Sequence, residues 1–144
     1  MTKFIVALSL VSLTFGCQSR SSESSANAAA QANAQPKIVS VQAVADWLRH
    51  KTATVLDANG KDVRESMGTV PGAVLLSSSH DYSVNELPAA KGTKLVFYCG
   101  GEMCRASDSA AARAAKAGYS DVNIMRAGIL GWKNAGQPTQ IPRS

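Results

Sequence analysis

The sequence contains few aromatic residues and few cysteines. Of its 144 residues, 6% are aromatic and three are cysteine. Three cysteines are too few for a fold held together by disulfides. No basic cluster is interleaved with aromatic side chains and the net charge is only +5, so we expect no nucleic-acid partner. The length suits one domain, and the hydrophobic content of 45% is ordinary for a globular protein.

The chain also lacks an apolar run long enough to span a bilayer comfortably. Residues 4–15 are mainly apolar, follow the positive charge of Lys3 and precede Gly16 and Cys17. We therefore predict that residues 1–16 are an export signal peptide and not a transmembrane helix. Residues 13–17 resemble the lipobox of bacterial lipoproteins, which implies that Cys17 becomes the lipidated first residue. Ordinary signal cleavage that leaves Cys17 unmodified is the alternative.

Large apolar side chains are absent from the segment that follows. Residues 18–36 consist mainly of Ser, Ala, Asn and Gln. Such a segment cannot bury enough surface to offset the entropy lost on ordering, so we predict a disordered tether over residues 17–36. These features predict an exported protein on the periplasmic side of the cell envelope, held at a membrane by its N-terminal lipid. A leader without a role is the alternative for the tether.

Residues 37–140 alternate between short apolar runs and stretches with helical spacing. The apolar runs predict five strands, and the stretches between them predict helices. Strands alternating with helices favour a parallel sheet covered on both faces, so the expected fold class is α/β. The predicted strands are residues 37–39, 54–56, 73–76, 95–98 and 122–125, and a surface loop is predicted over 77–86.

The central predicted strand ends at Cys99, and a glycine-containing loop then leads into a helix for which Ser107 or Asp108 is the expected N-cap. Ligands bind at the carboxyl ends of parallel strands, and a helix N-terminus favours an anion such as a thiolate. We therefore predict that Cys99 is a nucleophile. An inert buried thiol is the alternative for Cys99, and a flexible turn is the alternative for the loop that follows it. The predicted anion-binding loop consists of Gly100, Gly101, Glu102, Met103, Cys104 and Arg105.

A set of landmarks over residues 37–138 resembles a single rhodanese-like domain. In chain order they are Val55-Leu56-Asp57, Arg64-Glu65, residues 68–73, residues 96–99, Ala117-Gly118-Tyr119 and residues 128–132. The resemblance implies a three-layer fold with a five-stranded parallel sheet flanked by helices on both faces. It also implies a sulfurtransferase in which a Cys99 persulfide carries sulfur from a small donor, such as thiosulfate or a polysulfide, to a thiol or cyanide. No organic cofactor or metal is needed for that reaction. Asp57 is expected to support the site by orienting the loop backbone or nearby arginines.

Three features depart from the usual pattern of that family. Ala58 and Asn59 stand where members commonly have an arginine, and Thr69 stands where they usually have a histidine. Cys99 and Gly118 also lie farther apart than usual. Loop length in this superfamily is linked to substrate size, so the identity of the donor stays open.

Two residues of the loop keep other functions open. Cys104 could act as a resolving thiol that forms a disulfide with Cys99, which would make the chain a thiol-disulfide redox protein, or it could pack beneath the loop. Cys99 to Arg105 reads C-x5-R, which resembles phosphatases whose arginine clamps phosphate. Glu102 puts a negative charge in that cradle, so a phosphatase or arsenate reductase is less favoured. A non-catalytic binding module is the remaining alternative.

Overall fold

The computed structural model describes residues 35–142. The predicted signal peptide, most of the tether and the lipidation site at Cys17 lie outside the described residues. None of the helices it describes is long and apolar enough to cross a bilayer. In chain order the elements are β1 (Lys37–Val39), α2 (Val41–Arg49), β2 (Thr54–Asp57), α3 (Lys61–Met67), β3 (Val74–Leu75), the 3-10 helix η1 (Val84–Glu86), β4 (Leu95–Tyr98), α4 (Ala106–Lys116), β5 (Val122–Met125) and α5 (Gly128–Asn134).

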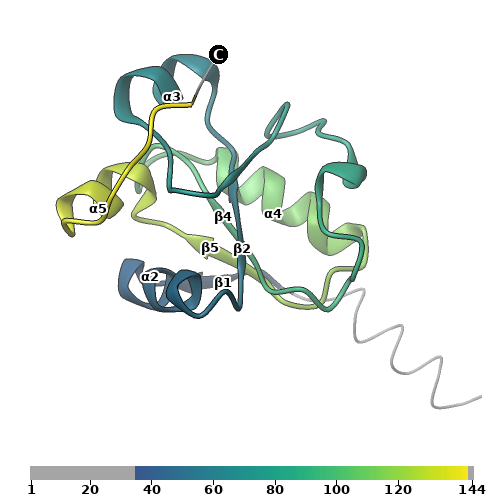
Figure 1. Ribbon diagram of the computed structural model, residues 1–144. Helices are drawn as coiled ribbons and strands as arrows, with labels where there is room; N and C mark the ends of the chain where they lie inside the picture. The colour runs from purple at the N-terminus through teal and green to yellow at the C-terminus, as the bar shows by residue number, and fades with distance from the viewer. Residues whose placement is uncertain (1–34, 143–144) are drawn as a thin grey trace, which may run out of the picture.

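The five strands form one sheet in the order β1-β5-β4-β2-β3, and every pair is parallel. β4 therefore lies at the centre, flanked by β5 and β2 (Figure 1). This architecture confirms the α/β fold predicted from the alternation of strands and helices. Because all strands run the same way, the residues that follow β2 and β4 come to the same edge of the sheet.

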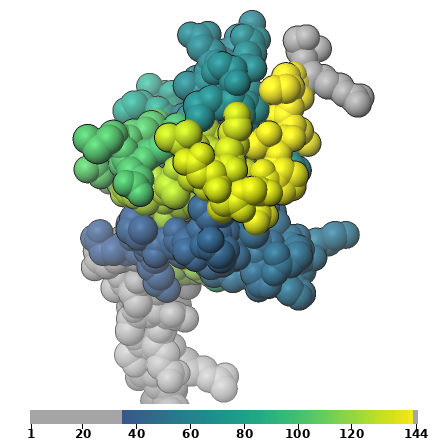
Figure 2. All heavy atoms as spheres, turned by 90° about the vertical axis from the view of Figure 1, so that its left-hand side faces the viewer, coloured from purple at the N-terminus to yellow at the C-terminus, as the bar shows by residue number. Residues whose placement is uncertain are grey.

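Each face of the sheet carries its own hydrophobic core. On one face α4 packs against the strands, whereas α2 and α5 cover the other face (Figure 1). Successive residues of a strand point to opposite faces, so Val96 belongs to one core and Phe97 to the other. The space-filling view shows the C-terminal segment, in yellow, between the region of α3 above and α2 below (Figure 2).

Local boundaries differ from the predictions in three places. The expected cap of α4 at Ser107 or Asp108 is wrong: the helix begins at Ala106 with Arg105 at the N-cap. Ser107 lies within the first turn, and its hydroxyl contacts Cys99 instead of capping the end of the helix. The strand predicted over 73–76 shortens to Val74–Leu75. The loop predicted over 77–86 contains η1, which Ser83 caps in a capping box with Glu86.

Candidate active site

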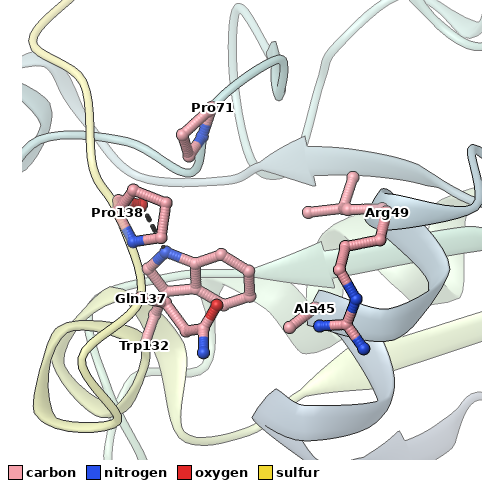
Figure 3. Close-up of a pocket in the computed structure, with 7 residues that line it drawn as sticks. Ala45, Arg49, Pro71, Trp132, Gln137 and Pro138 are labelled. Carbon is pink, nitrogen blue, oxygen red and sulfur yellow. Dashed lines mark hydrogen bonds between the residues drawn. The ribbon is translucent and has the colours of Figure 1, made fainter.

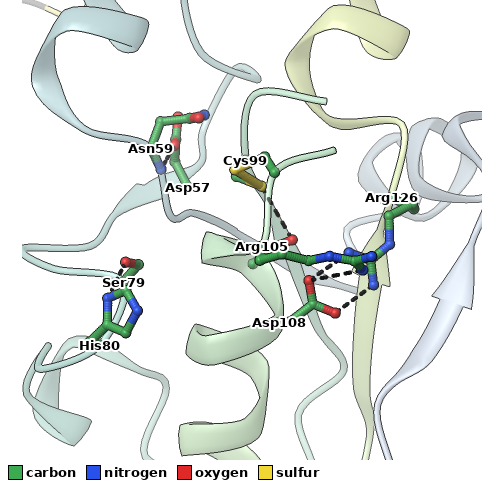
Figure 4. The surroundings of a disulfide bond; sticks show 10 residues. Asp57, Asn59, Ser79, His80, Cys99, Arg105, Asp108 and Arg126 are labelled. Atoms are coloured by element: carbon green, nitrogen blue, oxygen red, sulfur yellow. Dashed lines mark hydrogen bonds and ion pairs between the residues drawn. A yellow bond between two sulfur atoms is a disulfide. The ribbon is translucent and has the colours of Figure 1, made fainter. Parts of the chain in front are cut away.

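Cys99 lies directly after β4, at the carboxyl edge of the sheet, and is only 2% exposed. It forms a disulfide with Cys104 at the other end of the loop (Figure 4). Their Cα atoms are 6.3 Å apart, within the range of ordinary disulfides. Cys104 itself is partly exposed. The loop that was predicted to bind an anion thus also brings its two thiols together.

The N-terminus of α5 binds the start of this loop through two backbone hydrogen bonds. The Ile129 N–H donates to the Cys99 carbonyl at 2.8 Å, and the Leu130 N–H donates to the Gly100 carbonyl at 3.0 Å. These are N–H groups of a first helical turn, which have no acceptor within their own helix. The backbone that follows Cys99 is therefore fixed by an element far away in sequence.

Hydrogen-bond donors lie next to the Cys99 sulfur and along the loop that follows it. The Ser107 hydroxyl, buried in the first turn of α4, lies 3.4 Å from Cys99 Sγ. Within residues 35–142, the backbone N–H groups of residues 100 to 103 donate to no protein acceptor. Free N–H groups and a helix N-terminus both stabilise an anion, so the surroundings favour a thiolate or persulfide once the disulfide is open.

Asp57 ends β2 beside Cys99 and is completely buried (Figure 4). Its carboxylate accepts hydrogen bonds from the Asn59 N–H at 2.7 Å and from the Tyr98 hydroxyl. The Tyr98 oxygen in turn accepts from the Val70 N–H at 3.0 Å. Burial, together with the Asp57 charge, raises the pKa of Tyr98 well above its usual value, so this hydroxyl stays protonated and donates. Asp57 thereby fixes Tyr98, the residue that precedes Cys99.

The arginine nearest to Asp57 binds the backbone and not the carboxylate. Arg64 donates from one nitrogen to the carbonyls of Asp57 and Leu76, both at 2.9 Å. Its Nε lies 3.6 Å from the Asp57 carboxylate, which is an ion pair but too long for a hydrogen bond. Arg64 therefore ties β2 to the segment after β3, and its charge partly balances that of the buried carboxylate.

Asn59 has an unpaired donor close to the loop. Its side chain is buried, and its Nδ2 has no hydrogen-bond partner within the described chain. The amide lies against the loop, because a Cβ placed on Gly100 would come 3.8 Å from Asn59 Oδ1. Buried polar groups usually have partners, so an unpaired one beside the loop that follows Cys99 indicates a contact for a ligand. In the sequence, Asn59 was notable only because it stands, with Ala58, where family members commonly have an arginine.

The other predicted loop residues face outward. Glu102 and Met103 form the tip, and Met103 is 92% exposed. Arg105 is 74% exposed, with its guanidinium 3.9 Å from the Asp108 carboxylate (Figure 4). Asp108 accepts two hydrogen bonds from Arg126, and this contact holds the pKa of Asp108 below its usual value. Arg105 is thus engaged at the surface and not placed over Cys99, as a phosphate clamp would need.

A pocket of about 470 Å³ lies away from this loop, between α2 and the segment after α5 (Figure 3). None of its lining residues belongs to the loop from 99 to 105. Trp132, which forms part of its wall, donates from its indole nitrogen to the Pro138 carbonyl at 2.7 Å and is otherwise buried. The indole therefore serves to anchor the C-terminal segment. The full lining is Ala45, Leu48, Arg49, Pro71, Trp132, Gln137 and Pro138.

Residues 40–135 match the family model of the rhodanese-like domain. The chain belongs to the rhodanese-like family. No curated protein matches it in a sequence comparison. The match accounts for the landmarks in the sequence and for the parallel sheet with Cys99 at its carboxyl edge.

Solved structures share the fold of this rhodanese-like domain at low sequence identity. The Alr3790 protein from Anabaena sp. superposes with a TM-score of 0.60 at 21% identity, covering 71% of this chain and 79% of that one. A protein of unknown function from Rhodopseudomonas palustris, RPA3614, described as a possible tyrosine phosphatase, gives 0.60 at 21%, covering 85% and 98%. Thiosulfate sulfurtransferase from Pseudomonas aeruginosa gives 0.58 at 19%, covering 82% of this chain and 24% of that protein. At these identities the comparisons establish the fold alone.

Proposed function

We propose that the domain is a sulfurtransferase that carries sulfane sulfur as a persulfide on Cys99. The observation that supports this most directly is the place of Cys99: it is buried at the end of the central strand, next to Ser107 in the first turn of α4, and it begins a loop whose N–H groups have no protein acceptor within residues 35–142. An anionic sulfur is stabilised at such a position. Membership in the rhodanese-like family supports the same chemistry.

The cycle begins once the disulfide is reduced. The Cys99 thiolate attacks the sulfane sulfur of a donor such as thiosulfate, a new sulfur–sulfur bond forms on Cys99, and sulfite leaves with the electron pair of the broken bond. The loop N–H groups and Ser107 stabilise the negative charge on the persulfide. A thiol or cyanide then accepts the outer sulfur, and the Cys99 thiolate returns.

A mass measurement on the reduced protein tests this proposal. After reduction and removal of the reductant without air, the Cys104→Ser variant is incubated with thiosulfate or with polysulfide. We expect the Cys99 peptide to gain the mass of one sulfur atom. The Cys99→Ser variant should gain none, and Cys17→Ser in the Cys104→Ser background should load as Cys104→Ser alone does. If neither donor leaves sulfur on Cys99 in Cys104→Ser, the proposed function is wrong.

We further propose that this reaction takes place on the periplasmic side of the envelope, with the chain held at the membrane by a lipid on Cys17. The support is the apolar run over residues 4–15 and the lipobox-like sequence that ends at Cys17. Labelling of a bacterial culture with a clickable fatty acid should mark the full chain. The label should disappear in Cys17→Ser, and its persistence would contradict the lipid anchor.

A further inference from the structure

We propose that Cys104 is a second catalytic thiol, which unloads the Cys99 persulfide inside the chain, releases hydrosulfide and leaves the Cys99–Cys104 disulfide for an external dithiol to reduce. This inference rests on the proposed loading of Cys99, but it assigns a different product and a different partner. The product is free hydrosulfide in place of a persulfidated acceptor. The partner is a dithiol reductant.

The structure places the two sulfurs within bonding reach without any change in the fold. They are joined in a disulfide, and their Cα atoms are 6.3 Å apart. A turn in which the Cys104 N–H donates to the Gly101 carbonyl at 3.0 Å brings Cys104 back toward Cys99. The opposite end of the loop is fixed by the contacts of α5 with the Cys99 and Gly100 carbonyls. A thiol held this close competes strongly with thiols from solution.

The proposed step balances in atoms and electrons. The Cys104 thiolate attacks Sγ of the Cys99 persulfide, a bond forms between the two Sγ atoms, and the bond from Cys99 Sγ to the outer sulfur breaks. The outer sulfur leaves with the bonding electron pair, takes one proton and departs as hydrosulfide. The two cysteine sulfurs are oxidised to the disulfide as the sulfane sulfur is reduced. A dithiol then supplies two electrons and two protons to restore both thiols.

The unequal exposure of the two sulfurs decides where that dithiol attacks. Cys99 is buried, whereas Cys104 is partly exposed and follows the fully accessible Met103 at the loop tip. An incoming thiolate reaches Cys104 Sγ and forms a mixed disulfide there. The leaving group is then the Cys99 thiolate, which Ser107 and the start of α4 stabilise. Attack at Cys104 Sγ is also the faster route, because the Cys99 thiolate that it releases is the better-stabilised leaving group.

One anaerobic turnover separates this inference from the proposed function. Reduced chain, freed of reductant, receives excess thiosulfate, and sulfite, hydrosulfide and peptide masses are measured together. We expect about one hydrosulfide for each sulfite, and a Cys99–Cys104 disulfide in the product. Cys104→Ser should release sulfite and keep the extra sulfur on Cys99, with hydrosulfide reduced about tenfold or more. The chain incubated without thiosulfate should keep both thiols free.

The failures of the two ideas are distinguishable. If Cys104→Ser holds a persulfide but the unchanged chain releases no hydrosulfide and stays persulfidated, then Cys104 does not resolve, and only the inference is wrong. If no variant yields sulfite or persulfide, the proposed function fails as well. A disulfide that forms equally in the absence of thiosulfate would also overturn the inference, because oxidation would then be independent of sulfur loading.

The position of attack has its own test. The oxidised chain is treated with glutathione, quenched with acid and mapped by peptide mass spectrometry. We expect the mixed disulfide on Cys104 and a free thiol on Cys99. Glutathione on Cys99, with Cys104 free, would overturn the assignment. Addition of dithiothreitol should remove the adduct and restore hydrosulfide release with fresh thiosulfate.

Discussion

Gly128, the first residue of α5, lies directly against the backbone of Cys99. A Cβ on Gly128 would come 2.5 Å from the Cys99 carbonyl oxygen and 2.6 Å from the Gly101 nitrogen. The residue also has a positive φ of +62°, a conformation that L residues with a side chain avoid. No other residue type allows α5 to approach the loop so closely and to bind its carbonyls.

Replacement of Gly128 should therefore damage both the fold and the site. Gly128→Ala adds the strain of a positive φ and a collision with backbone that cannot move aside, which together should cost about 2–4 kcal/mol of stability. Gly136→Ala is a matched control, because its φ is +70° but no atom lies within 4 Å of the added Cβ. Urea unfolding of the two variants measures the difference. Equal losses would show that the contact with the loop contributes nothing.

The hydroxyl of Tyr98 should matter more than that of another buried tyrosine. Tyr98→Phe removes a hydrogen bond to the buried Asp57 carboxylate and leaves the Val70 N–H unpaired, so we expect a loss of about 2–3 kcal/mol. Tyr82→Phe removes one hydrogen bond to the neutral Ala110 carbonyl and should cost about 1 kcal/mol. Burial raises the pKa of Tyr82 to about 12, so it too is a protonated donor at neutral pH. Denaturant midpoints with unchanged slopes give the comparison, and a smaller loss in Tyr98→Phe would contradict it.

Ser107 should tune the reactivity of Cys99. In the reduced chain its buried hydroxyl can donate to the thiolate, so Ser107→Ala should raise the pKa of the Cys99 thiol and slow its alkylation at neutral pH about threefold to tenfold. The measurement is the rate of iodoacetamide labelling of the Cys99 peptide against pH, in a Cys104→Ser background. Ser109→Ala, two residues further along α4, should leave the profile in place. An unshifted profile in Ser107→Ala would exclude the hydrogen bond.

The pair of Asp108 and Arg126 should make stability depend on pH in the acid range. Because its hydrogen bonds from Arg126 lower the pKa of Asp108 in the folded chain, this pair stabilises the fold above the unfolded value of 3.8. That contribution is lost as the pH falls through the lower folded pKa. After allowance for solvent screening it amounts to about 1 kcal/mol.

The matched measurement compares Asp108→Asn with Asp81→Asn, whose side chain is exposed and forms no ion pair in the part of the chain that the structure describes. Thermal midpoints recorded from neutral pH to about pH 2 should fall less steeply for Asp108→Asn than for the unchanged chain. Asp81→Asn should follow the unchanged chain. A parallel fall for Asp108→Asn would contradict the sign of this linkage.

The strands and their parallel arrangement could be predicted because local sequence patterns carry that information. The run at β4 is continuously apolar and that at β5 is interrupted only by Asn123, as is typical of strands covered on both faces. The position of Cys99 at a strand end followed from the same pattern. The boundaries of the elements were harder to predict. Ser107 is of a residue type favoured at N-caps, but its contact with Cys99 depends on the packing of α4 against the loop.

The contacts that surround Cys99 depend on residues distant in sequence. Gly128 belongs to a landmark that was recognised, yet its role follows only from the approach of α5 to the loop. Tyr98 was predicted as an apolar strand residue, and its hydroxyl acquires a function through Asp57 on the neighbouring strand. The disulfide could not be predicted, because spacing alone does not fix the geometry of two thiols.

Asn59 provides the last prediction, which concerns the binding of the donor. Its buried Nδ2 has no partner within residues 35–142, and its amide lies beside Gly100. An oxyanion bound next to Cys99 would accept a hydrogen bond from Asn59 Nδ2. Asn59→Ala should therefore raise the KM for thiosulfate about fivefold to tenfold with little change in kcat. Asn85→Ala, an exposed change in η1, is the control. Reaction with a neutral alkylating reagent should be the same in both variants, because it needs no oxyanion contact. If KM for thiosulfate is unchanged in Asn59→Ala, the unpaired amide does not bind the donor.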